Sequence, residues 1–150
     1  PQHLDQIGHP DLNSLIDEIA HLGLINAYLR GTTCPDLEAF RGLRADMDQR
    51  SLRTLGLFGC PILSGDLSPL ADLDWLQHLS ITRSREVCDI SPLARLSSLV
   101  SLNLEHTSVA DIRPLFELDD LRELRLEGAP VEPDQVEEIR RRIPELQIDS

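Results

Sequence analysis

His78 and Ser80 come closer to a catalytic arrangement than any other pair in this 150-residue chain. A histidine can act as general base toward a serine hydroxyl, provided that a third group orients it. Residues two apart on a strand share a face but stand several ångströms apart, and only Asn103 and Glu105 are candidates for the third group. The sequence has no G-x-S-x-G, phosphate-loop or H-E-x-x-H motif. We therefore predict that the protein is not an enzyme.

Metal chemistry has equally little support in the sequence. Cys34, Cys60 and Cys88 form no C-x-x-C pair, and neither His78 nor His106 stands at a ligand spacing from them. Their number is odd, and we expect reduced cysteines that are buried or half-buried. The sequence therefore predicts neither a metal site nor a cofactor.

One pattern fills most of the chain, an L-x-x-L-x-L frame that recurs every 22 to 24 residues. The middle leucines of five copies are Leu55, Leu79, Leu102, Leu124 and Leu146, and a degenerate sixth copy begins at Leu24. A return segment, D-[LI]-x-P-L-x-x-L, follows three of the frames. A fixed period of about 20–29 residues with this pattern is the signature of a leucine-rich-repeat solenoid.

The sequence therefore predicts an α/β fold, a leucine-rich-repeat solenoid with about six parallel strands on its concave face and helices or 3-10 turns on its convex face. One repeat alone cannot cover its leucines, so stacked repeats must share a core. We expect residues 1–150 to form a single domain. The expected strands lie near 24–29, 52–57, 76–81, 99–104, 121–126 and 143–148.

Two positions of the turns also repeat. Proline fixes φ and lacks a donor, so it suits the start of a short helix; the repeated prolines are Pro69, Pro92 and Pro114. Small or hydroxylated residues follow the strands, and we expect hydroxyls there to bond backbone groups freed at the turn. These residues are Thr32, Cys60, Ser84, Thr107 and Ala129.

The two ends of the chain depart from the repeat. Residues 1–23 predict a helical cap that stops at Gly23, and residues 35–50 predict a full helix. A third helix is predicted just before the last strand, which lies almost at the C-terminus. Because an open sheet edge must be protected, we expect charge, a partner or further sequence to cover it.

The charge balance limits the partners. The chain has 26 acidic residues against 14 arginines and a formal net charge of −12, whereas a nucleic-acid ligand requires a basic face. No apolar run approaches the roughly 18 residues of a membrane span, and no secretory signal opens the chain. We expect a cytoplasmic protein with a protein partner, and leave its oligomeric state open.

Recognition by the concave face is the function that remains. Outward side chains alternate with buried leucines along each strand, and tyrosine and arginine are enriched at binding hot spots. The predicted binding residues are Tyr28, Arg30, Phe58, His78, Ser80, Asn103, Glu105, Glu123, Arg125 and Glu127. Because the last three strands carry mostly acids, a partner would offer an apolar anchor and a basic patch. Alternatively, Phe58 packs under the segment that follows it and Tyr28 against the cap.

The sequence also resembles known repeat families. Residues 96–131, from "LSSLVSLNLEHTSV" onward, resemble the 22-residue leucine-rich repeats of bacterial proteins, internalin-like in period. Residues 89–109 also resemble the repeat arrays at the C-termini of actinobacterial NACHT-type NTPases. That second resemblance implies a sensor module for an attached NTPase, which would precede Pro1 because no NTPase motif lies within the chain.

Two functions of different class are therefore expected. The first is the C-terminal ligand-sensing domain of a larger bacterial signalling or defence protein, which fits a chain that begins with Pro rather than Met. The second is a stand-alone small adaptor or inhibitor that binds a protein through its concave face. A third, a secreted or surface adhesin or effector, is disfavoured by the missing secretory signal.

Overall fold

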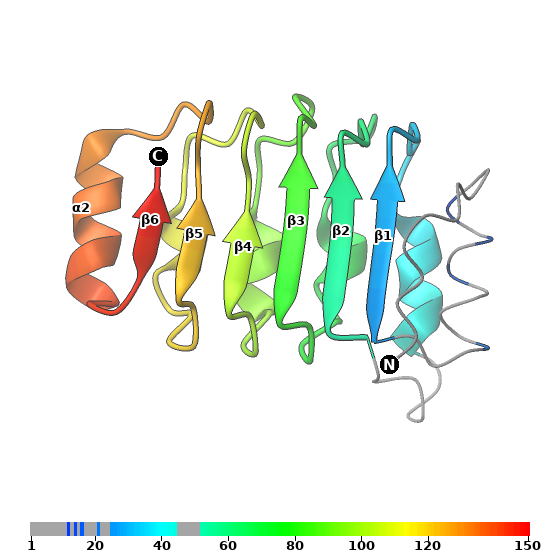
Figure 1. Cartoon of the computed structure of the whole chain (residues 1–150), viewed down its shortest axis with the longest axis horizontal. Coiled ribbons are helices and arrows are strands. Elements are labelled where there is room, and N and C mark those ends of the chain that lie inside the picture. The colour runs from blue at the N-terminus through cyan, green and yellow to red at the C-terminus, as the bar shows by residue number, and fades with distance from the viewer. Residues whose placement is uncertain (1–11, 13, 15, 17–20, 22–24, 45–51) are drawn as a thin grey trace.

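The computed structural model describes residues 12, 14, 16, 21, 25–44 and 52–150. In this part of the chain a sheet of six parallel strands runs in the order β1-β2-β3-β4-β5-β6, with each strand beside its neighbour in sequence. Short helical segments lie behind the sheet, and a longer helix, Pro133–Arg142, lies at its C-terminal end beside the last strand (Figure 1). This arrangement confirms the predicted leucine-rich-repeat solenoid.

The strands begin later than the sequence frame predicts; β2, for example, begins at Thr54 rather than at 52. The first leucine of three frames closes a turn before its strand: the amides of Leu76, Leu99 and Leu121 donate to the carbonyls three residues earlier at 2.9, 3.0 and 3.0 Å. That leucine is therefore part of the core but lies before the first hydrogen-bonded residue of the strand. The strands are β1 Asn26–Arg30, β2 Thr54–Phe58, β3 His78–Thr82, β4 Ser101–Asn103, β5 Glu123–Arg125 and β6 Gln147–Asp149.

The last repeat departs further from the predicted frame. Leu124 pairs with Ile148, whereas the sequence spacing aligns Leu124 with Leu146. Helix α2 (Pro133–Arg142) is followed by Ile143 as its C-cap, and the Leu146 amide then donates to the Ile143 carbonyl at 3.0 Å. A full helix contains more residues than a 3-10 turn, so β6 begins later in the sequence than the repeat frame predicts.

Short 3-10 segments form the rest of the described convex side. The repeated prolines occupy the first or second position of η3, η4 and η5, as predicted. The segments are η1 Glu38–Arg44, η3 Ser68–Leu70, η4 Ser91–Arg95 and η5 Arg113–Leu115. The full helix predicted over 35–50 is therefore wrong for 35–44, while 45–50 lies outside the described residues.

The predicted cap over 1–23 lies mostly outside the described residues. Leu12, Ser14, Ile16 and His21 are helical. Leu12 and Ile16 are each 8% exposed and belong to the hydrophobic core.

Leucine fills the core, and the turns are pinned by hydroxyls. The Ser84 hydroxyl donates to the Cys60 carbonyl at 2.6 Å and the Thr107 hydroxyl to the Leu104 carbonyl at 2.8 Å, which confirms the role predicted for that position.

Cys34 and Cys60 are buried, but Cys88 is exposed, contrary to prediction. Its neighbour Val87 is the side chain that enters the core there.

Three aspartates repeat one hydrogen-bonded turn at the entry to η3, η4 and η5. Asp66, Asp89 and Asp111 each accept the backbone N–H two residues on, at 2.8, 2.8 and 3.0 Å. These contacts lower the carboxyl pKa values. The causes are the N–H and hydroxyl of the following serine at Asp66, and the serine hydroxyl and N–H at Asp89. At Asp111 the Arg113 side chain and then its N–H lower the pKa from 3.8 to about 2.

We expect acid to destabilise the fold between about pH 4 and pH 2 through these turns. Because the folded pKa values are depressed, the stabilisation is complete above the ordinary pKa and is lost as pH falls through the folded values. Asparagine keeps the turn acceptor without titrating, so a triple Asp→Asn variant at 66, 89 and 111 should lose less Tm over that range. Thermal melts measure this, with Asp120→Asn, an exposed acid outside these three aspartate turns, as a control that should follow the wild type.

Candidate functional site: the concave face

The outward side chains of the strands form three rows across the sheet, which together we call the concave face. Parallel register places neighbours in a row about 4.8 Å apart. The first row is Asn26, Thr54, His78, Ser101, Glu123 and Gln147, and the second is Tyr28, Gly56, Ser80, Asn103, Arg125 and Asp149. The third begins with Arg30, Phe58 and Thr82 and continues beyond the strands with Glu105 and Glu127. All the residues predicted for binding lie in these rows.

An aromatic pair occupies one end of the face, over β1 and β2. The rings of Tyr28 and Phe58 stack with centroids 6.0 Å apart and planes inclined by 20°. The guanidinium carbon of Arg30 lies 5.1 Å from the centroid of the Phe58 ring, a cation–π contact. Both rings lean over Gly56, where a Cβ would stand 2.5 Å from Phe58 Cε2 and 2.7 Å from Tyr28 Cδ1. Glycine is thus required for this packing.

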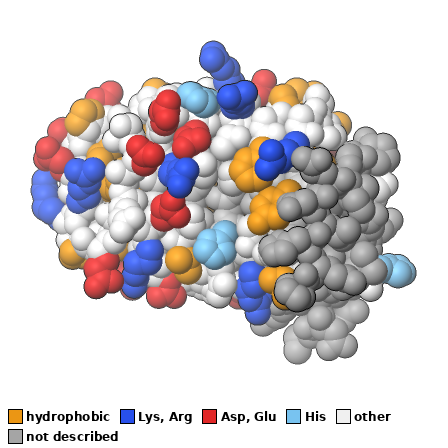
Figure 2. Space-filling model, in the orientation of Figure 1, with side chains coloured by type: hydrophobic (Ala, Val, Ile, Leu, Met, Phe, Trp, Pro, Cys, Tyr) orange, Lys and Arg blue, Asp and Glu red, His pale blue; other side chains and the backbone are white. Residues whose placement is uncertain are grey.

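The opposite end of the face, over β4 to β6, is acidic. It carries four carboxylates against one arginine, a formal charge of −3, from Glu105, Glu123, Glu127, Asp149 and Arg125. Figure 2 shows charged side chains gathered over these strands, and apolar ones over β1 and β2.

Glu123 is held in place by two neighbours. Arg125 donates to its Oε1 through Nε and Nη2 at 3.0 and 2.9 Å, and the Ser101 hydroxyl donates to its Oε2 at 3.1 Å. The Arg125 side chain, and then the Ser101 hydroxyl, keep the pKa of Glu123 below its ordinary value. The carboxylate is therefore ionised at neutral pH.

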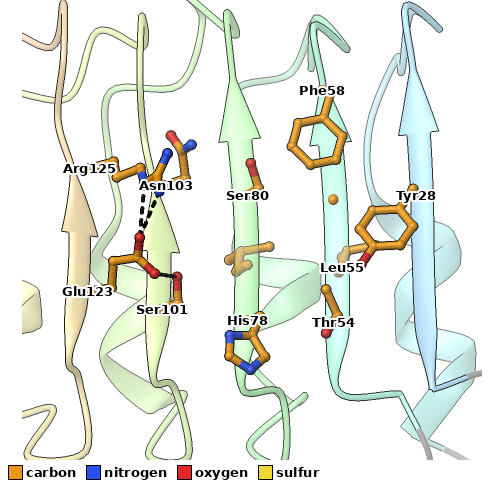
Figure 3. Close-up of a pocket in the computed structure, with 12 residues that line it drawn as sticks. Tyr28, Thr54, Leu55, Phe58, His78, Ser80, Ser101, Asn103, Glu123 and Arg125 are labelled. Carbon is orange, nitrogen blue, oxygen red and sulfur yellow. Dashed lines mark hydrogen bonds and ion pairs between the residues drawn. The ribbon is translucent and has the colours of Figure 1, made fainter. Parts of the chain in front are cut away.

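A hollow of about 170 Å³, the central hollow, separates the two ends. Figure 3 shows Tyr28 and Phe58 on one side of it and Glu123 on the other, with Ser80 between. The floor is deep because the second row carries glycine and serine on β2 and β3. The Ser80 hydroxyl oxygen is buried and has no hydrogen-bond partner among the described residues.

The residues considered for catalysis do not form a triad. Since Ser80 lacks a partner in the described part of the chain, His78 does not activate its hydroxyl. Asn103 uses its side-chain oxygen to accept the Glu105 backbone N–H at 2.9 Å, so that oxygen is not directed at His78.

Arg83 and His106 lie beside the concave face, and the sequence analysis missed them. They line a second hollow of about 320 Å³ beside Phe58 and Glu105. Both residues have positive φ, 60° and 57°, at the turn position where other repeats have Gly31, Gly59 and Gly128. The sequence alone could have identified them, because Arg83 and His106 replace glycine at a turn position that is glycine in the other repeats.

Arg83→Gly should raise the free energy of unfolding by about 0.5–1 kcal/mol. A left-handed conformation costs a residue with a Cβ roughly 1–2 kcal/mol, and the greater freedom of glycine in the unfolded chain offsets about 0.5–1 kcal/mol of the relief. Urea denaturation measures the change. Arg85→Gly, at an exposed neighbour without positive φ, is the matched control and should lower stability; equal effects at both positions would contradict the strain at Arg83.

No protein-family model and no curated protein matches the sequence. Among solved structures, a leucine-rich-repeat protein of Leptospira interrogans superposes with a TM-score of 0.59 at 24% identity, over 69% of this chain and 26% of that one. Internalin C2 of Listeria monocytogenes gives 0.47 at 28% identity, over 76% and 66% of the two chains. Internalin F of the same organism gives 0.49 at 18% identity, over 93% and 55%.

The Leptospira match shows the fold, a leucine-rich-repeat solenoid, and agrees with the expected similarity to bacterial repeat proteins at that level. The chain spans about a quarter of the length of that protein, 26%. In the described part of the chain, no helix is both long and apolar enough to cross a membrane.

Proposed function

We propose that this chain is a protein-binding leucine-rich-repeat module, without enzymatic activity, that docks its partner on the concave face. The observation that carries the proposal is the stacked pair Tyr28 and Phe58. Aromatics make up 3% of the chain, yet two of them lie half-buried on the outward face with Arg30 against one ring. Half-exposed aromatic rings beside arginine are the composition of interface hot spots.

The electrostatics of the face favour a protein partner with two kinds of contact. The aromatic pair and the acidic end are about three strand spacings apart, which is roughly 15 Å. A partner strip of that length would place an apolar anchor on the rings and a basic patch over β4 to β6. The formal net charge of −12 disfavours a phosphate backbone as the ligand.

Peptide selection tests this docking surface. Peptides enriched on the protein from a random displayed library would be titrated against the wild type and against a Tyr28→Ala, Phe58→Ala variant. Concave-face docking predicts that most enriched peptides bind the variant weakly or not at all. Peptides that bind both proteins equally well would refute the assignment of the face.

We further propose that the module is the ligand-sensing domain of a larger cytoplasmic signalling or defence protein. The resemblance of residues 89–109 to NACHT-associated repeats supports this. A stand-alone adaptor or inhibitor is the alternative. An immunoblot of the native gene product decides between them, because a band near 16.8 kDa fits the alternative and one several times larger fits the sensor.

A further inference from the structure

We infer that the central hollow receives one cationic side chain of the partner, a lysine or an arginine, with its aliphatic stem against Tyr28 and Phe58 and its charged head toward Glu123. This inference rests on the proposed docking function and identifies the contact that would give it specificity. Three features of the hollow carry it: the aromatic wall, the carboxylate opposite and the hydroxyl on the floor.

The aromatic wall suits the stem and the charge of such a side chain. Long cationic side chains bury their methylene groups against apolar surface while the head stays polar, and ring faces attract cations. Arg30 already lies 5.1 Å from the Phe58 ring centroid, so the stem of the incoming side chain would use the ring surface that Arg30 leaves uncovered. Tyr28 extends the wall toward β1 by stacking on Phe58.

The carboxylate opposite retains room for a donor. Glu123 Oε1 accepts both hydrogen bonds from Arg125, whereas Oε2 accepts a single one, from Ser101. Each carboxylate oxygen has two acceptor positions, so Oε2 can take a further N–H. Arg125 neutralises only part of the local charge, because Glu105 and Asp149 also lie near it.

The floor supplies an unused acceptor. Ser80 Oγ is covered in the free protein and has no hydrogen-bond partner among the described residues, so the serine side chain would turn toward the hollow to meet a ligand donor. An unsatisfied buried hydroxyl costs free energy that such a contact recovers. An ammonium or guanidinium head carries several donors, enough for Ser80 and Glu123 together. A purely apolar side chain would leave Ser80 unsatisfied, and an acidic one would meet the carboxylate of Glu123.

The size of the hollow fits one side chain. Its volume is about 170 Å³, which is too small for a helix, because a helix with its side chains is roughly 10 Å wide. The partner backbone must therefore pass above the face while one residue enters. Gly56 and Ser80 make that depth, because a larger residue at either position would fill the floor.

A charge-deletion cycle on the enriched peptides tests the inference. Each arginine in a peptide is replaced by citrulline, which keeps the shape but loses the charge, and each lysine by norleucine. At one position of the peptide, this replacement should weaken binding to the wild type at least ~10-fold. The same replacement should weaken binding to the Glu123→Gln variant less than ~3-fold, because the peptide charge and the Glu123 carboxylate interact directly. Isothermal titration calorimetry gives both affinities, and circular dichroism verifies that the variant is folded.

Glu127→Gln is the matched control, since Glu127 belongs to the acidic end but does not line the hollow. The ~10-fold dependence on the peptide charge should persist in it. Peptides that need Tyr28 and Phe58 but contain no essential cation, or whose cation matters equally in Glu123→Gln, would overturn the inference while leaving concave-face docking intact. If no enriched peptide depends on the aromatic pair, the proposed function fails, and the inference with it.

Discussion

Leu102→Ala should lower the free energy of unfolding by about 3–4 kcal/mol, within the range measured for fully buried leucines. Leu102 is 0% exposed and lies in β4 between Leu79 and Leu124, its partners in the sheet register. Rigid neighbouring repeats on both sides prevent the site from collapsing, so the lost transfer energy and the cavity both count.

The same substitution at an exposed leucine gives a matched control. Leu63 is 56% exposed, and Leu63→Ala should change the free energy of unfolding by no more than about 0.5 kcal/mol. Urea unfolding followed by circular dichroism and by tryptophan fluorescence measures both variants. Similar losses at the two positions would mean that the stacked leucine core does not carry the stability of the repeats.

The variant Tyr28→Ala, Phe58→Ala should lose at least about 2 kcal/mol of affinity for concave-face peptides, roughly 30-fold in Kd. The rings support each other over Gly56, so removing both deletes the apolar wall completely. Arg30 also loses the ring on which its guanidinium rests. Titration calorimetry on the selected peptides measures the loss.

Phe116→Ala is the control for a general effect of losing an aromatic ring. Phe116 is half-buried beyond η5 on the convex side, where its ring contacts the Arg142 guanidinium at 5.1 Å. The substitution should cost stability without changing peptide affinity. Weakened binding in this variant, or unchanged binding in the double variant, would place the docking surface elsewhere.

Much of the fold could be predicted because the repeat imposes local rules. Leu55, Leu79, Leu102 and Leu124 recur at a nearly constant spacing, so their strands stack in register and their outward neighbours are determined. Each strand alternates between core and surface, which is why Tyr28, Ser80 and the other predicted residues all lie on the concave face. The starts of η3, η4 and η5 could be predicted from their prolines, because the fixed φ of proline suits the first turn of a helix.

The last repeat could not be placed by the same rule. Leu146 matches the sequence frame, yet Ile148 is the residue that pairs with Leu124. The choice depends on how many residues α2 consumes before the chain returns to the sheet. That number is set by packing of Ile139 and Ile143 into the core and not by the spacing of leucines.

The sequence by itself determined the repeat, the strands and the set of side chains that share the outward face, because period and alternation act within a few residues. Only the tertiary structure decided what those side chains do together. The aromatic rings of two repeats meet over Gly56, the Glu123 carboxylate faces them across a hollow, and Ser80 is left without a partner at its floor. These relations join residues from different repeats, and only the packing of one repeat on the next brings them into contact.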